Sequence, residues 1–181
     1  MKKLEEKTLS TKVLYNGKII DLVLEEVELP NGNRSQREVV KHPGAVAILA
    51  INPENKIVLV KQYRKPLNRS IIEIPAGKLE KGESPESCAR RELEEETGFR
   101  IDRLTHIQSF YTSPGFADEI VHIYFADSLK KGTVQLDEDE FVDLMEVSLD
   151  EALELMKSNE IYDAKTAFAI QFLQLKQMEN E

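Results

Sequence analysis

GKLEKGESPESCARRELEEETGF, residues 77–99, is the segment from which the fold and chemistry of this chain are best inferred. Ser84 followed by Pro85 is a typical helix start, because a hydroxyl caps free amide groups and proline fits the first helical position. Gly98 is a natural helix stop. The segment therefore predicts a glycine-led loop followed by a helix over about 84–97.

Three glutamates of this helix, Glu92, Glu95 and Glu96, are spaced i, i+3 and i+4 and therefore share one helical face. Like charges at this spacing destabilise a helix by roughly 0.2–0.5 kcal/mol per pair. Converging carboxylates are, however, the ligands that hard divalent cations such as Mg²⁺ and Mn²⁺ prefer. The alternative is a solvated acidic face that Arg90 and Arg91 partly neutralise.

The same segment resembles the Nudix box at all nine of its fixed positions. The order is Gly, five residues, Glu, seven residues, Arg-Glu-apolar, one residue, Glu-Glu, one residue, and Gly-apolar, over 23 residues. Neither a solvated acidic face nor a purely structural acidic protein accounts for this ordered pattern. The resemblance implies a Nudix hydrolase, an enzyme that cleaves nucleoside diphosphates linked to another moiety.

Length and composition are those of an ordinary globular domain with extensions: 181 residues, 41% hydrophobic and 31% charged. A net charge of −9 disfavours a nucleic-acid binder, because phosphate backbones favour basic surfaces. No apolar run is long enough to span a membrane, and the N-terminus lacks the apolar core of a signal peptide. We therefore expect a cytoplasmic protein without nucleic-acid or membrane partners. The single cysteine, Cys88, excludes an internal disulfide and favours a small buried apolar role.

Alternating residues predict an N-terminal antiparallel β-hairpin layer, with strands at 18–29 and 35–41 joined by Asn31-Gly32. Pro43-Gly44 marks a boundary, so we expect an N-terminal β-strand extension over 1–43 and a larger domain over 44–181. The larger domain is expected to contain strands at 45–51, 57–63, 71–74, 104–111, 119–126 and 141–147, and helices at 84–97, at 148–158 and from Asp163. The fold class is therefore α+β. The resemblance implies a Nudix-type α/β/α sandwich around a mixed sheet.

Other segments resemble the ADP-ribose pyrophosphatase group of this family. They are residues 60–64, 72–77, 113–115, 137–140 and 163–175. Pro114 lies fifteen residues beyond Phe99, where this group carries proline. The resemblance implies hydrolysis of ADP-ribose to AMP and ribose 5-phosphate. It leaves open another nucleoside diphosphate sugar or a dinucleotide as substrate, and also a non-catalytic ADP-ribose sensor.

The resemblance also implies which residues bind metal. Glu92, Glu96 and the main-chain carbonyl of Ala76 match the principal Mg²⁺ ligands, and Glu95 and Glu140 are expected to complete the cluster. Two or three Mg²⁺ ions are implied, with Mn²⁺ as a possible substitute.

The general base and the structural positions follow from the same resemblance. Glu138 is expected to be the general base, and the alternative is that Glu138 binds metal while Glu140 acts as base. The box positions with a structural role are Gly77, Glu83, Arg91 and Gly98.

Substrate contacts are implied for a further set of residues. Arg64 matches an arginine that contacts phosphates, Arg37 and Glu38 match positions near the adenine or terminal ribose, and Glu119 matches an acidic residue near the ribose. A solvated hairpin edge is the alternative for Arg37 and Glu38. The predicted substrate loop consists of Ser113, Pro114 and Gly115, and the alternative for Pro114 is a simple turn. In this group the hairpin reaches across a dimer, so a homodimer that acts on a small-molecule nucleotide is expected.

Overall fold

The computed structural model describes residues 4–134 and 141–179. The chain divides into two compact units. The small unit comprises residues 1–44 and 110–120, and the large unit comprises residues 45–109 and 121–181. Each unit is described by itself below.

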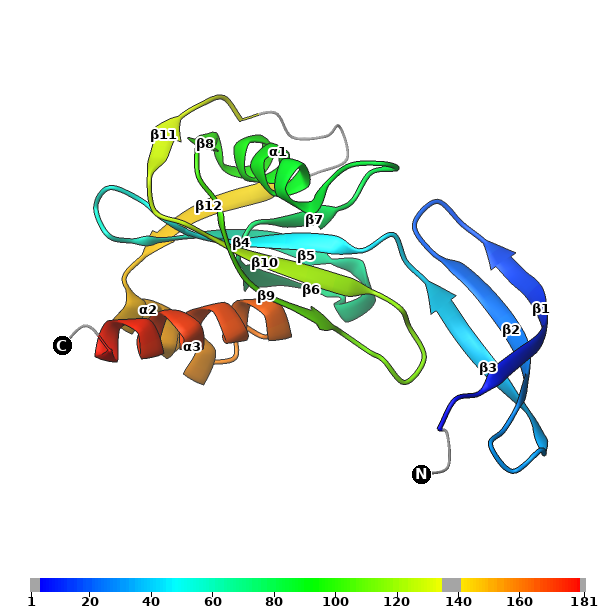
Figure 1. The fold of residues 1–181 in the computed structure, drawn as a ribbon. Helices are drawn as coiled ribbons and strands as arrows, with labels where there is room; N and C mark the ends of the chain where they lie inside the picture. The colour runs from blue at the N-terminus through cyan, green and yellow to red at the C-terminus, as the bar shows by residue number, and fades with distance from the viewer. Residues whose placement is uncertain (1–3, 135–140, 180–181) are drawn as a thin grey trace. The chain divides into compact units, whose positions relative to one another are not determined.

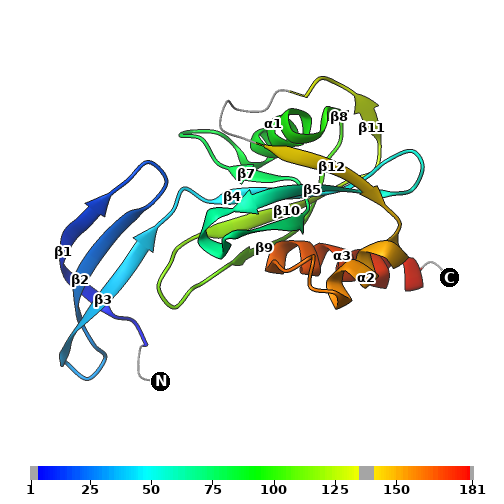
Figure 2. The same cartoon turned by 180° about the vertical axis from the view of Figure 1, so that it is seen from behind.

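The small unit contains a three-stranded antiparallel sheet of β1 (Lys7–Asn16), β2 (Asp21–Glu28) and β3 (Arg34–Lys41), in that order (Figures 1 and 2). The predicted hairpin is confirmed as β2 and β3, and its turn contains Gly32 at φ 84°, a conformation that glycine adopts without strain. Strand β1 is an addition that the sequence analysis did not expect. All ten of its residues are exposed. Its sequence therefore lacks the alternation of apolar and polar residues that a strand with one buried face shows.

Residues 110–120 belong to the small unit because they hydrogen-bond along β3. The Val40 amide donates to the Phe116 carbonyl at 2.8 Å, and the Asp118 amide donates to the Val40 carbonyl at 3.1 Å. The Asp118 carboxylate also accepts from the His42 amide at 2.8 Å. A segment that follows β3 by about seventy residues in sequence is therefore fixed to it.

The strands of the main sheet of the large unit are β4 (Ala45–Ile51), β5 (Ile57–Arg64), β6 (Arg69–Glu73), β7 (Ala76–Lys78), β9 (Thr105–Tyr111), β10 (Ile120–Ala126) and β12 (Val142–Val147). They form a mixed sheet with the order β12-β5-β4-β10-β9, in which β6 also pairs with β5 and β7 with β4. Strand β4 is parallel to β10 and antiparallel to β5 and β7. A separate two-stranded ribbon consists of β8 (Phe99–Ile101) and β11 (Leu129–Lys131).

Helices cover both faces of this sheet. Helix α1 (Pro85–Thr97) lies on one face, and α2 (Leu149–Lys157) and α3 (Ala164–Met178) lie on the other (Figures 1 and 2). Residues 46–50 of β4 are fully buried, as a strand covered on both sides must be. The α+β class and the α/β/α sandwich are therefore confirmed. Within the described residues, no helix has the length and apolar character needed to cross a membrane.

Local capping chemistry fixes the helices of the large unit. Ser148 and Glu151 form the capping box expected at the start of α2. Asp163 caps α3 by accepting from the Thr166 amide. On α1, Cys88 is buried in the apolar core, and burial raises the pKa of its thiol to about 12, so it is inert as a nucleophile.

Candidate active site

Helix α1 places the predicted metal-binding carboxylates against strand β7. The Ser84 hydroxyl accepts from the Ser87 amide, Pro85 occupies the first turn, and Gly98 ends the helix at φ 70°. These caps fix where the helix begins and ends, and the buried side chains of Cys88, Ala89 and Leu93 fix which face packs against the sheet. On that face the Glu92 and Glu96 residues are only 8% and 5% exposed, which is unusual for carboxylates and indicates specific partners.

Strand β7 contacts both of these buried carboxylates. The Ala76 amide donates to Glu96 Oε2 at 3.1 Å. A Cβ atom placed on Gly77 would lie 1.8 Å from Glu92 Cδ, so only glycine leaves room for this carboxylate. The loop before the helix and the helix itself therefore form one cradle, with Glu92 and Glu96 packed against the backbone of Ala76 and Gly77.

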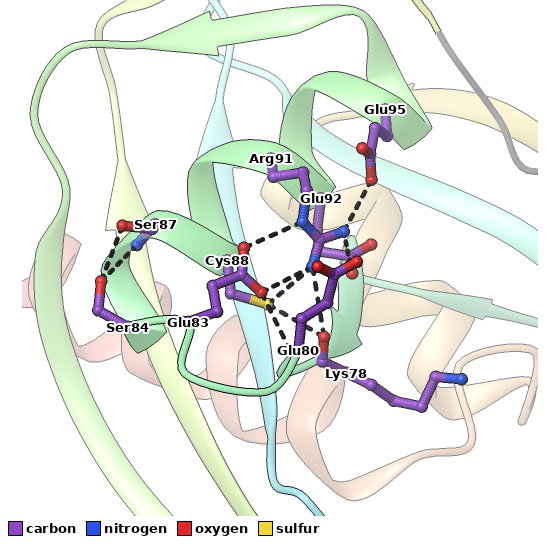
Figure 3. A network of polar contacts seen from close by, with 9 residues as sticks. All are labelled: Lys78, Glu80, Glu83, Ser84, Ser87, Cys88, Arg91, Glu92 and Glu95. Atoms are coloured by element: carbon purple, nitrogen blue, oxygen red, sulfur yellow. Dashed lines mark hydrogen bonds and ion pairs between the residues drawn. The ribbon is translucent and has the colours of Figure 1, made fainter. Parts of the chain in front are cut away.

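Arg91 connects the carboxylates around this cradle (Figure 3). Its guanidinium donates to both oxygens of Glu83 at 3.0 Å each. Its remaining terminal nitrogen donates to Glu92 Oε1 at 2.8 Å and to Glu95 Oε2 at 2.9 Å. The hydrogen bonds that Arg91 donates lower the pKa of Glu83 to about 2, and the same bonds raise the pKa of Arg91. Arg91 thus joins the loop to the helix and partly neutralises the acidic face.

We expect Glu83→Gln to reduce the free energy of unfolding by about 1–2 kcal/mol at pH 7, after discounting for solvent screening. The depressed pKa means that the ionised Glu83 stabilises the fold above its ordinary pKa of 4.5, and that this stabilisation is lost as the pH falls toward about 2. Urea unfolding of both proteins between pH 7 and pH 3 measures the difference. The exposed Glu80, changed to Gln, is the matched control. A difference in stability that stays constant over this pH range would contradict the expectation.

The donor atoms in the cradle fit a hard divalent cation. They are carboxylate oxygens of Glu92 and Glu96 beside the backbone of Ala76, and oxygen ligands are those that such a cation prefers. Over residues 4–134 and 141–179, no group of three His, Cys, Asp or Glu side chains gathers closely enough to hold an ion by itself. The other predicted contributors, Glu138 and Glu140, lie outside the described residues.

Arg64, the predicted phosphate contact, lies at the end of β5. Its Nε donates to Glu73 Oε2 at 2.6 Å, and the other Glu73 oxygen accepts from Lys165 Nζ at 2.5 Å. Arg64 was predicted from the sequence, whereas Glu73 and Lys165 were not. Gln62 was not predicted either, and its amide nitrogen is buried with no hydrogen-bond partner among the described residues. The sequence offered one indication of a role for Glu73, which is that this charged residue directly follows the apolar pair Ile71-Ile72 at the end of a strand.

The remaining predicted substrate contacts all belong to the small unit. Arg37 forms a two-pronged ion pair with Glu6, at 2.9 and 2.6 Å. Glu119 accepts from the Thr112 hydroxyl at 2.5 Å, whereas Glu38 is exposed. The predicted loop of Ser113, Pro114 and Gly115 forms a tight turn in which the Ser113 carbonyl accepts from the amides of Phe116 and Ala117.

Two family models match the chain. A model described as the NUDIX domain matches residues 41–168. A model described as the nucleoside diphosphate sugar hydrolase N-terminal domain matches residues 6–40. Together they match residues 6–168, from the strands of the N-terminal extension to the start of α3.

Similar proteins and structures agree with these matches. The chain is 63% identical over 179 residues to an ADP-ribose pyrophosphatase of Bacillus subtilis (strain 168), covering 98% of this chain and 97% of the relative. It is 58% identical over 175 residues to a methanol dehydrogenase activator of Bacillus methanolicus, covering 96% and 95%. A crystal structure of an ADP compounds hydrolase superposes with a TM-score of 0.85 over 99% of this chain and 98% of that chain, at 22% identity, which indicates a shared fold.

Proposed function

Because this chain belongs to the Nudix family, we propose that it hydrolyses the diphosphate bond of ADP-ribose, giving AMP and ribose 5-phosphate. The observation that carries the proposal is the pair of buried carboxylates, Glu92 and Glu96, packed against the backbone of β7. A relative that is 63% identical over nearly its whole length, and named for this activity, supports the choice of substrate.

Each proposed residue has a chemical role. If Mg²⁺ binds, Glu92, Glu96, the Ala76 carbonyl, Glu95 and Glu140 would hold it. Two or three ions are proposed, and Mn²⁺ would substitute for them. When bound, these ions neutralise phosphate charge, orient the diphosphate and lower the pKa of a coordinated water. The protein then has mainly to position the reactants and stabilise charge.

Proton transfer and phosphate binding require further side chains. Glu138 takes the proton of the attacking water as general base. Arg64 binds the phosphates, because its planar guanidinium offers paired donors and its Nε is already held by Glu73.

Small-unit residues are proposed to recognise the nucleoside and sugar. Arg37 and Glu38 contact the adenine or the terminal ribose, and Glu119 contacts the ribose. The Arg37 guanidinium is already oriented by Glu6, which supports a preformed contact. The specificity loop of this proposal is Ser113, Pro114 and Gly115.

Hydrolysis in heavy-oxygen water tests the function directly. The chain is incubated with ADP-ribose in H₂¹⁸O, with and without Mg²⁺, and the products are identified by mass spectrometry. We expect AMP and ribose 5-phosphate only with Mg²⁺, and the label in one of them identifies the attacked phosphorus. Intact ADP-ribose at high enzyme concentration with Mg²⁺ or Mn²⁺ would reject the proposal.

Other substrates are the first alternative. A panel of GDP-mannose, NAD, FAD and diadenosine polyphosphates, compared by kcat/KM, separates ADP-ribose from another nucleoside diphosphate sugar or a dinucleotide. A non-catalytic ADP-ribose sensor would bind ADP-ribose in calorimetry and release no product.

Activation of a dehydrogenase is a second candidate function, because a relative 58% identical is named a methanol dehydrogenase activator. Adding the wild-type chain and its Glu92→Gln variant to a methanol dehydrogenase distinguishes two cases. Activation by wild type alone would attribute the effect to hydrolysis, and activation by both would attribute it to binding.

We also propose a homodimer in which β1 pairs with a second copy. Strand β1 is an edge strand of ten exposed residues, and Leu9, Val13, Leu14 and Tyr15 present apolar side chains to solvent. Long exposed edges of this kind are normally covered. A two-fold symmetric dimer is the commonest homo-oligomer, so a second copy of this chain is the proposed cover, and the extension over 1–43 is proposed as the dimerisation element.

Sedimentation tests this assembly. The wild-type chain is expected to sediment at twice the 20.7 kDa of one chain, and Val13→Lys is expected to shift it to one chain at micromolar concentration. Leu144→Lys, at a similarly exposed apolar residue of the large unit, is the control and should leave the dimer intact. A wild-type monomer with full activity would contradict the proposal.

A further inference from the structure

Glu73 is a buried carboxylate held between two cations of the large unit. It ends β6, is 3% exposed, and accepts from Arg64 at 2.6 Å and from Lys165 at 2.5 Å. Side chains alternate along a strand, so Arg64 and the buried Val60, four positions apart, lie on the same face of β5. Val60 lies opposite Glu73 in the pairing of β5 with β6, so Glu73 is on this face as well. The Arg64 side chain must therefore run along the sheet to reach Glu73, which restricts its orientation.

Lys165 anchors this carboxylate from α3. Besides Glu73, Lys165 Nζ donates to Asp163 at 2.8 Å, and Asp163 is the residue that caps α3. The next residue, Thr166, accepts from the Ile74 amide at 2.9 Å. The start of α3 is thus attached at adjacent points to Glu73 and Ile74, immediately before the segment that carries Ala76 and Gly77.

The charge balance keeps Glu73 ionised. Burial alone raises the pKa of Glu73, but the nearby charges of Lys165 and Arg64 outweigh burial, and the net pKa is below the ordinary value. Lys165 is itself only 15% exposed in its side chain and is shared with Asp163. Glu73 therefore has a fixed partner other than Arg64, and it can orient the arginine without depending on it.

Arg64 would otherwise be a flexible side chain at a strand end. A long arginine has several rotatable bonds, and ordering it on binding costs free energy. The bond to Glu73 uses one of the five N–H groups of the guanidinium, the one on Nε. The N–H groups of the two terminal nitrogens are the paired donors that can bind a phosphate. The Arg64 side chain remains 38% exposed, so it is accessible to a ligand.

We propose that Glu73 and Lys165 are positioning residues, which hold the Arg64 guanidinium in the orientation that binds the diphosphate of the substrate. Neither residue touches the substrate. This proposal rests on the proposed function in one respect, which is that Arg64 binds a phosphate of the substrate. It adds that Lys165 of helix α3 affects this contact through Glu73.

A double-mutant cycle tests the link. Arg64→Ala, Glu73→Gln, Lys165→Met and the corresponding pairs are compared by kcat/KM for ADP-ribose and by the Kd of ADP in calorimetry. Glu73→Gln and Lys165→Met alone are expected to lower kcat/KM and weaken ADP binding about 10-fold, because contacting residues couple at this level. When Arg64 is already replaced by Ala, Glu73→Gln and Lys165→Met are each expected to change kcat/KM and the Kd of ADP by less than about 2-fold, because the side chain that they position is absent. Lys165→Arg keeps the charge and should rescue most of the loss.

Lys157→Met is the matched control, since Lys157 forms an exposed ion pair with Glu154 on α2 and should leave both readouts unchanged. Thermal unfolding of every variant verifies that it is folded. Equal losses with and without Arg64, or a fall in melting temperature with unchanged kcat/KM and Kd, would overturn the proposal and leave a purely structural network. If Glu73 and Lys165 are coupled to Arg64 in ADP binding but the wild-type chain does not hydrolyse ADP-ribose, the positioning role is retained and the proposed function is rejected.

Discussion

Glu138→Gln is expected to lower kcat by at least about 100-fold with little change in KM, because the amide keeps the shape of the carboxylate and cannot accept the proton of the attacking water. Since the lost interaction acts in the transition state, substrate affinity should survive. Steady-state kinetics at saturating Mg²⁺ between pH 6 and pH 9 measure the effect. In the same experiment the acidic limb of the pH profile, which reports ionisation of the base, should flatten.

Glu140→Gln separates the two possible assignments of this acidic segment. If Glu140 is a metal ligand, its defect should lessen as Mg²⁺ is raised, whereas the defect of Glu138→Gln should not respond to metal. Asp137→Asn and Asp139→Asn remove the same charge from neighbouring positions and should retain most of the turnover. A Glu138→Gln enzyme with near-normal kcat, beside an inactive and metal-insensitive Glu140→Gln enzyme, would transfer the base to Glu140.

Local chemistry explains why much of the fold was predictable from sequence. Ser84 and Gly98 define α1 through hydrogen bonds within a few residues. Residues 46–50 are a short, uniformly apolar run that follows Pro43-Gly44, which favours a buried strand. Strand β1 was not predicted, because a fully exposed strand has no buried face and so no alternation of apolar and polar residues. The short strands β7, β8 and β11 have three residues each, and their existence depends on partners distant in sequence.

The same distinction holds for the candidate site. Helical spacing alone put Glu92, Glu95 and Glu96 on one face, but their burial differs. Glu92 and Glu96 are buried, whereas the Glu95 side chain is 34% exposed. The contact between Glu73 and Lys165 joins residues 92 positions apart. No periodicity in one sequence predicts such a pair, because the packing of α3 against the sheet creates it.

Gly77→Ala is expected to lower turnover by about 100-fold or more, since displacing a catalytic group by about 1 Å has effects of that size. A Cβ at this position would lie 1.8 Å from Glu92 Cδ and 2.0 and 2.2 Å from its two oxygens. Either the buried carboxylate must turn away or β7 must leave its pairing with Val46 on β4. Either movement displaces the proposed metal ligands. Mn²⁺ affinity, measured by calorimetry, should therefore decrease along with kcat.

Gly82→Ala is the control for this effect of close approach. Gly82 lies in the same loop at φ 84°, and a Cβ there would meet no atom within 4 Å. Alanine at position 82 should therefore cost about 1 kcal/mol of stability through backbone strain and keep its turnover. If Gly77→Ala and Gly82→Ala both retained wild-type turnover and Mn²⁺ affinity, the position of the Glu92 carboxylate against β7 would not matter for catalysis. The function would then have to be sought away from this cradle.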